Sequence, residues 1–154
     1  MILFFLVIYN ELEVGMKIFY SAVFGSVLLI SGCATTPVPT DAALEVPQSK
    51  VLNERFQMQE EGMGQVVVKR DSGMSGSACD SRVYANREPV AEIGPSEKVT
   101  FYLPLGRQML AAKATGVCAG GLVEIEASVE KGVPEVYRVS YGSNGEFSIQ
   151  RTAF

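Results

Sequence analysis

The chain of 154 residues contains no histidine and no tryptophan, and it has only three cysteines. Without histidine, the usual general base at neutral pH and the commonest metal ligand are both missing. No two cysteines form a CxxC pair, which disfavours zinc, and their wide separation disfavours an iron–sulfur cluster. The composition therefore predicts no metal site, no cofactor and no Ser–His catalytic pair.

Clusters of positive charge are also missing. The chain carries 13 Lys and Arg against 17 Asp and Glu, for a formal net charge of −4, and the cations form no run. Binding to phosphates requires clustered cations. Nucleic acid is accordingly excluded as an expected partner.

The apolar run near the N-terminus is too short to span a bilayer. A transmembrane helix requires roughly 20 apolar residues, whereas this run follows Lys17 and extends only from Ile18 to Ile30. A cation, a short apolar run and then small residues are the three regions of an export signal. The stretch Ile30-Ser31-Gly32-Cys33 resembles the lipobox of bacterial lipoproteins, which implies cleavage before Cys33 and acylation of its thiol. The first expected partner is therefore a lipid bilayer; the alternative is a buried cysteine after an ordinary apolar helix.

Residues 1–15 do not fit this signal, because Glu11 and Glu13 place acid where positive charge is needed. We expect translation to begin at Met16, with residues 16–32 as the signal peptide and residues 1–15 as an upstream extension that is not part of the protein. The codons for residues 12–15 can spell a ribosome-binding site, which would lie just before the Met16 codon and would support translation from there. Reading the nucleotide sequence tests this hypothesis. Ala34, rather than Asp, follows the cysteine, so the resemblance implies the outer membrane, with the domain facing the periplasm or the cell surface.

Residues 33–63 are expected to form a flexible tether after the lipidated Cys33. The segment is rich in threonine and proline near its start, with Pro37, Pro39 and Pro47, and such a composition favours extended or disordered chain. Residues 49–61 carry apolar side chains among charged ones. They are compatible with a short amphipathic helix or with a solvated linker.

Cys79 and Cys118 are predicted to form a disulfide, because an exported chain meets oxidising conditions. Closing a loop of about 40 residues stabilises a fold by about 4 kcal/mol in the chain-entropy treatment. The alternative is a pair of free buried thiols.

Strand patterns separated by turn residues fill residues 64–154. Lys98–Leu103 and Leu122–Glu130 alternate apolar and polar residues, as strands with one buried face do. The pattern predicts an all-β domain, a small sandwich of seven or eight strands. The expected strands are residues 66–70, 82–86, 89–93, 98–103, 107–115, 122–130, 135–141 and 146–151.

Short motifs in this region resemble known envelope proteins. Val83-Tyr84-Ala85-Asn86, Pro89-Val90-Ala91 and the segment Val99–Gly106 resemble the PEGA and DUF2846 type of small envelope β-domain. Arg87 stands where that type usually has Gly and Gln108 where His is common; since a positive φ is costly at Arg87, we expect a hairpin turn longer than two residues. The wider pattern, with Cys118-Ala119-Gly120-Gly121 and the C-terminal Thr152-Ala153-Phe154, resembles a group of uncharacterised proteobacterial lipoproteins.

The segment Arg70–Cys79 is the candidate binding loop, because its glycines and serines present backbone N–H groups and hydroxyls. The candidate contact residues are Arg70, Asp71, Ser72, Ser75 and Ser77. The competing interpretation is a tight structural loop held by the disulfide.

The sequence favours a non-catalytic envelope lipoprotein that binds an envelope protein or glycan or serves as a structural accessory. A second hypothesis is a periplasmic inhibitor that inserts residues 72–78 into a lytic enzyme, such as a lysozyme or a protease. A remote third is a hydrolase with a Ser–Lys dyad, combining Ser75 or Ser77 with Lys69, Lys98 or Lys113.

Overall fold

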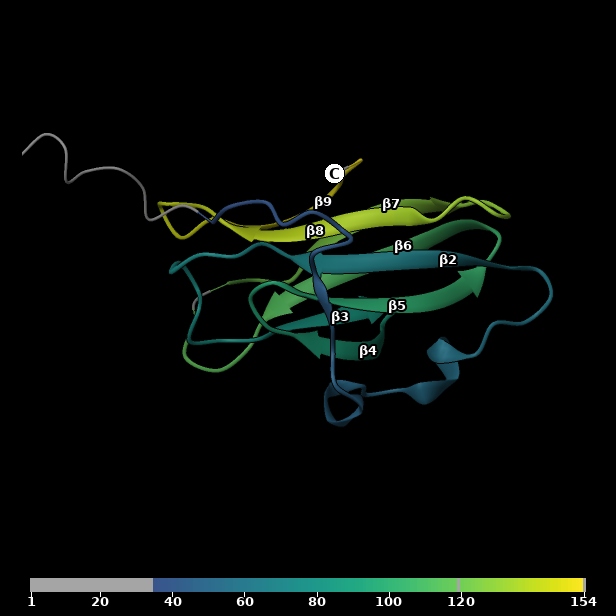
Figure 1. The fold of residues 1–154 in the computed structure, drawn as a ribbon, viewed down its shortest axis with the longest axis horizontal. Helices are drawn as coiled ribbons and strands as arrows, with labels where there is room; N and C mark the ends of the chain where they lie inside the picture. Colours follow the sequence, from purple (N-terminus) through teal and green to yellow (C-terminus); the bar gives the residue numbers. More distant parts are fainter. Residues whose placement is uncertain (1–34, 119, 154) are drawn as a thin grey trace, which may run out of the picture. The chain divides into compact units, whose positions relative to one another are not determined.

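A computed structural model describes residues 35–118 and 120–153, and these residues form nine β-strands in two sheets (Figure 1). The described residues contain no α-helix and two short 3-10 helices, η2 (Gln48–Lys50) and η3 (Glu54–Gln57). Cys33 and the signal and upstream segments lie outside the described residues. The chain divides into two compact units, Met1–Gly32 and Cys33–Phe154, and the description below concerns the second.

Eight strands correspond to the runs expected from the sequence, and a two-residue strand precedes them. The bounds are β1 Leu44–Glu45, β2 Met63–Arg70, β3 Ser81–Ala85, β4 Glu88–Ile93, β5 Glu97–Pro104, β6 Gly106–Ala114, β7 Val123–Val129, β8 Glu135–Tyr141 and β9 Phe147–Arg151. The all-β prediction is therefore confirmed.

The five-stranded sheet has the order β1-β5-β2-β8-β9, and the four-stranded sheet has the order β4-β3-β6-β7. Most neighbours are antiparallel, but β2 pairs with β8 in parallel, and β1 pairs with β5 in parallel. A parallel pair requires a crossover rather than a hairpin. The chain between β2 and β8 makes that crossover by building the whole four-stranded sheet and β5.

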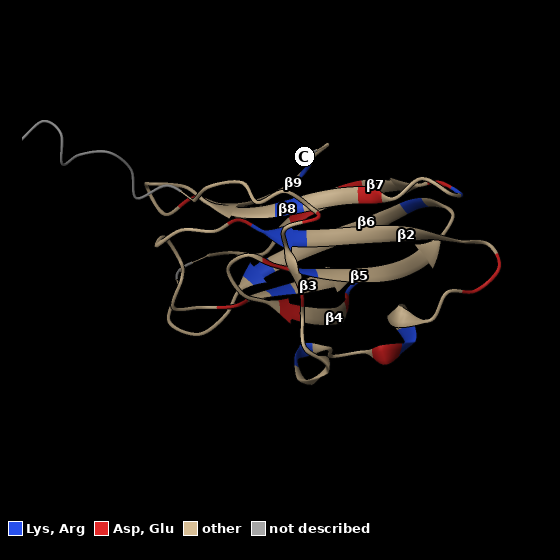
Figure 2. Ribbon diagram, in the orientation of Figure 1, with Lys and Arg blue, Asp and Glu red and all other residues tan. Residues whose placement is uncertain are grey.

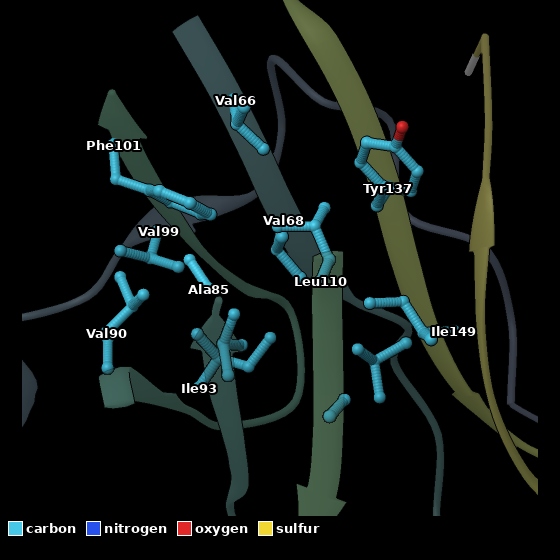
Figure 3. Close-up of a cluster of buried hydrophobic side chains, with 14 of the residues drawn as sticks. Val66, Val68, Ala85, Val90, Ile93, Val99, Phe101, Leu110, Tyr137 and Ile149 are labelled. Atoms are coloured by element: carbon cyan, nitrogen blue, oxygen red, sulfur yellow. The ribbon is translucent and has the colours of Figure 1, made fainter. Parts of the chain in front are cut away.

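Alternation along the strands explains the core. Val66 and Val68 of β2 are fully buried, as are Phe101 of β5 and Leu110 of β6, and they belong to one apolar cluster supplied by both sheets (Figure 3). Burial of a side chain of this size contributes about 1.5–3 kcal/mol. This single cluster holds the two sheets together.

The segment after Cys33 is bound to the domain from Thr35 onward, contrary to the expectation of a flexible tether. We call residues 35–46 the strap; it crosses the outer face of the five-stranded sheet (Figure 1). Thr36 bridges to Ser72 beyond the end of β2, and β1 at the other end of the strap pairs with β5. Composition suggested disorder, but buried apolar side chains fix the segment, namely Val38, Ala43 and Val46.

Residues 47–58 continue along the domain as the two 3-10 helices rather than as an amphipathic α-helix. Phe56 of η3 is 7% exposed, and its ring meets that of Phe101 edge to face, 6.3 Å between centroids. The backbone of Leu52 donates to the carbonyl of Val90, so this segment also covers the edge strand β4.

The β3–β4 turn has two residues, so the expectation of a longer turn is wrong. Asn86 and Arg87 adopt φ values of 48° and 71°, the pair of positive angles of a type I′ turn. The Asn86 side chain offsets part of the cost, because its Oδ1 accepts from the Met109 backbone N–H at 3.0 Å.

Candidate binding surfaces

Arg70, at the end of β2, lies inside the molecule beneath the loop that follows it. Its side chain is 1% exposed. The guanidinium donates to the carbonyl oxygens of Gly76 at 2.6 Å, of Cys79, and of Ile93 at 3.4 Å. Its carbon Cζ lies 4.6 Å from the centre of the Tyr141 ring, in a cation–π contact. Arg70 therefore anchors the loop rather than presenting a charge to a partner.

The loop closes over Tyr141 at a glycine. Gly76 has φ 69°, and a Cβ atom there would lie 2.7 Å from the tyrosine ring. Neither the backbone angle nor the space admits a side chain. The tyrosine hydroxyl lies 3.1 Å from Ser81 Oγ, which completes a buried polar contact under the loop.

Asp71 is also buried, at 1% exposure, on the opposite face of the sheet from Arg70. Its carboxylate lies 3.7 Å from the Arg138 guanidinium. Burial raises the pKa of Asp71, and the charges of Arg138 and Lys69 and the nearby Thr35 side chain oppose that rise only in part. Arg70 and Asp71, two of the five candidate contact residues, are thus enclosed by the fold.

The three serines of the candidate loop lie nearer the surface. The backbone N–H of Ser72 donates to the Thr36 carbonyl at 3.0 Å, and Ser75 Oγ donates to the Gly142 carbonyl at 3.3 Å. Ser77 is exposed. The structure therefore brings the serines together on one loop, two of them tied to neighbouring segments.

The predicted disulfide is present. Cys79 and Cys118 are joined, with 6.1 Å between their Cα atoms, and they are 39 positions apart in the sequence. The bond ties the candidate loop to the β6–β7 connection. It therefore brings the two glycine-containing segments to the same end of the domain.

Two of the three lysines proposed for a Ser–Lys dyad bind the strap, and Lys69 is fully buried. Lys69 Nζ donates to the Val38 carbonyl at 2.6 Å and to Thr40 Oγ1 at 2.9 Å, and Lys98 Nζ donates to the Thr40 carbonyl at 2.7 Å. Both thus hold the strap. Burial lowers the pKa of Lys69. Lys113 lines a hollow on the four-stranded sheet.

That hollow was not predicted from the sequence. It is a shallow depression of about 280 Å³ on the outer face of β3, β6 and β7. Apolar side chains form part of it, including Met109 and Leu122, which are 41% and 53% exposed. Its full lining is Tyr84, Arg87, Met109, Ala111, Lys113, Leu122 and Glu124.

The alternation of inward and outward residues along β6 is the sequence feature that indicates this surface. Met109 and Ala111 are the outward members of a strand whose inward members are Leu110 and Ala112. An apolar residue on the outward face of an amphipathic strand is the kind of exception that marks a contact surface.

A second depression, of about 340 Å³, lies between η3 and the ends of β3 and β5 and includes Phe56, Met58 and Tyr102.

Within residues 35–118 and 120–153, no three His, Cys, Asp or Glu side chains lie close enough to hold a metal ion. In the same part of the chain, no helix is long and apolar enough to cross a membrane. A scan against protein-family models found no match, and searches of curated proteins and of solved structures found no significant similarity.

Proposed function

We propose that the mature protein consists of residues 33–154 and is a β-sandwich domain held on a bacterial membrane by acylated Cys33. The observation that supports this most is the coincidence of two boundaries. The compact unit that contains the β-domain begins at Cys33, the residue that the lipobox-like stretch marks as the new N-terminus. This division of the chain agrees with the proposed cleavage site.

The anchor is tested by the cellular location of a Cys33→Ser variant in a Gram-negative host. The acyl chains supply membrane affinity, since two or more chains bind far more stably than one. Without them we expect the protein to leave the outer-membrane fraction. A Cys33→Ser protein that stays in that fraction would contradict the lipid anchor.

We further propose that the domain has no catalytic role and binds a protein of the envelope through the hollow on the four-stranded sheet. The strap crosses the outer face of the five-stranded sheet beside the buried Val67 and Lys69 of β2. The four-stranded sheet instead presents exposed Met109 and Leu122 beside Arg87, Lys113 and Glu124. An apolar centre with a charged rim is the usual composition of a protein–protein contact.

Crosslinking in intact envelopes tests the binding surface. A Met109→Asp variant places a charge in the lining of the hollow, so we expect it to lose crosslinks that the wild-type lipidated protein forms. Leu105→Asp is the matched control, because Leu105 is 41% exposed, as Met109 is, and lines neither depression. Equal crosslinking by all three proteins would contradict the proposal that the hollow binds the partner.

A further inference from the structure

Three loops lie at the end of the domain where the strap begins at Thr35: residues 71–80, 115–118 and 142–146 (Figure 1). The disulfide joins the first loop to the second. The hydrogen bond from Ser75 Oγ to the Gly142 carbonyl joins the first to the third. We call this connected surface the loop end.

The strap ties the loop end closely to the lipidation position. The backbone of Thr35 donates to the Tyr141 carbonyl at 3.3 Å, and that of Thr36 donates to the Ser72 carbonyl at 2.8 Å. Thr35 is two residues from Cys33, and two residues of extended chain span at most about 7 Å. If Cys33 is acylated, as the proposed function requires, the loop end must therefore lie near the lipid headgroups.

The chemistry of the loop end suits that position. The three loops contain no lysine or arginine, and Figure 2 draws most of their length in tan. Their charged side chains are Asp71, which is buried, Asp80, which pairs with Lys50 at 3.2 Å, and the exposed Glu146. Met74 and Val117 are 86% and 92% exposed there. The turns at the opposite end of the strands contain Glu60, Arg87 and Lys131. The end nearest Thr35 thus exposes two apolar side chains on loops without a cation, whereas the turns at the far end carry Arg87 and Lys131.

We propose that Met74 and Val117 insert into the bilayer that holds the acyl chains of Cys33, so that the loop end is a second membrane contact. Burial in the boundary between headgroups and acyl chains removes both apolar side chains from water. Because the three loops carry no cation, the contact does not depend on anionic lipid. The Arg70 anchor and the disulfide hold both side chains in a fixed position toward the membrane.

The lack of tryptophan permits a direct test with single reporters. Met74→Trp and Val117→Trp place an indole at the loop end, and Val133→Trp, at a 49% exposed turn residue of the opposite end, is the control. Each full chain is processed and purified from membranes, its acylation is read from its mass, and it is reconstituted into phosphatidylethanolamine–phosphatidylglycerol vesicles with brominated acyl chains. The Cys33→Ser form of each variant in solution supplies the baseline emission.

In the acylated protein, we expect a blue shift and quenching by the brominated lipids for Met74→Trp and Val117→Trp, unchanged at a lower phosphatidylglycerol fraction, and neither effect for Val133→Trp. Acylated protein that floats with the vesicles but shows no quenching at either loop position overturns this inference and leaves the anchor intact. Quenching at all three positions also overturns it, because the domain would then have no preferred end at the membrane. A chain without acyl mass overturns the anchor and this inference together.

Discussion

Arg70 shows how a buried charge can organise a loop. Its guanidinium donates to three main-chain carbonyl oxygens and stacks on Tyr141. Hydrogen bonds from a charged donor contribute about 1.5–3 kcal/mol each. A planar, forked donor can meet several acceptors at fixed angles, which an ammonium group cannot.

We therefore predict that Arg70→Lys destabilises the domain by about 3 kcal/mol, because the shorter, compact cation leaves carbonyl oxygens buried without donors. Chemical denaturation measures the effect. Arg82→Met is the control: Arg82 pairs with Glu92 at 2.6 Å on a partly exposed face, where such pairs contribute at most about 1 kcal/mol. Equal losses in the two variants would show that Arg70 is not a special anchor.

The burial of Asp71 determines the direction in which its contribution to folding stability changes with pH. Burial raises its pKa in the folded protein above the ordinary 3.8, so the folded state holds its proton more tightly than the unfolded state does. The contribution of this group to stability is then greatest below about pH 4 and is lost as the pH rises through the folded pKa. An Asp71→Asn variant lacks this loss. We predict that its free energy of unfolding, relative to wild type, increases from pH 3 to pH 7; a decrease over that range would contradict the raised pKa.

At this scale the sequence predicted the disulfide but not the burial of Arg70 and Asp71. Removing the lipidation candidate left Cys79 and Cys118 as the single possible pair. A charged pair followed by Ser72 and Gly73 is typical of an exposed loop. The groups that enclose it come from distant positions, Thr36 in the strap and Tyr141 in β8.

Among the elements, the β3–β4 hairpin stores local strain. A residue other than glycine in the left-handed region costs roughly 1–2 kcal/mol, and Arg87 has φ 71°. Asn86 tolerates that region better and is tied to Met109 through its side chain.

We predict that Arg87→Gly raises the free energy of unfolding by about 0.5–1 kcal/mol, since relief of strain exceeds the added freedom of the unfolded chain. Thermal melting measures the gain. Asn86→Gly serves as the paired control and is expected to be destabilising, because it loses the hydrogen bond to Met109. A destabilised Arg87→Gly protein would mean that the arginine side chain makes a contact worth more than the strain.

The strap is an ordered segment that local sequence patterns do not predict. Residues 35–46 have no periodic apolar pattern, and prolines 37 and 39 suggest disorder. Their order depends on long-range contacts: Lys69 and Lys98 donate to the strap backbone, and the Glu45 carboxylate accepts from the Thr100 N–H at 2.6 Å. The strands could be predicted because the sequence of each one alternates between buried and exposed residues. The strap is ordered only by its contacts with the sheet, which no local pattern shows.

For the whole molecule, the sequence indicated an all-β domain but not the order of its strands. The parallel pairing of β2 with β8 joins residues about seventy positions apart, and no local pattern encodes it. The open hollow on the four-stranded sheet follows from that order, because the strap can cover only the sheet that contains β2 and β5.

The disulfide contributes at the scale of the whole domain. We predict that the Cys79→Ser, Cys118→Ser double variant loses about 4 kcal/mol, since the closed loop of 39 positions restricts the unfolded chain. Calorimetry with and without reductant gives the matched comparison. Wild type in reductant should melt near the double variant, and a melting temperature indifferent to both changes would contradict the stabilising role.

Mass spectrometry of the N-terminal peptide is the measurement that tests the proposed lipid anchor at Cys33. The protein is expressed with its full leader in a Gram-negative host and extracted from the membrane with detergent. We expect a mature N-terminus at Cys33 that carries a diacylglyceryl thioether, with no residue before it. An N-terminus upstream of Cys33, or an unmodified thiol at that position, would contradict it.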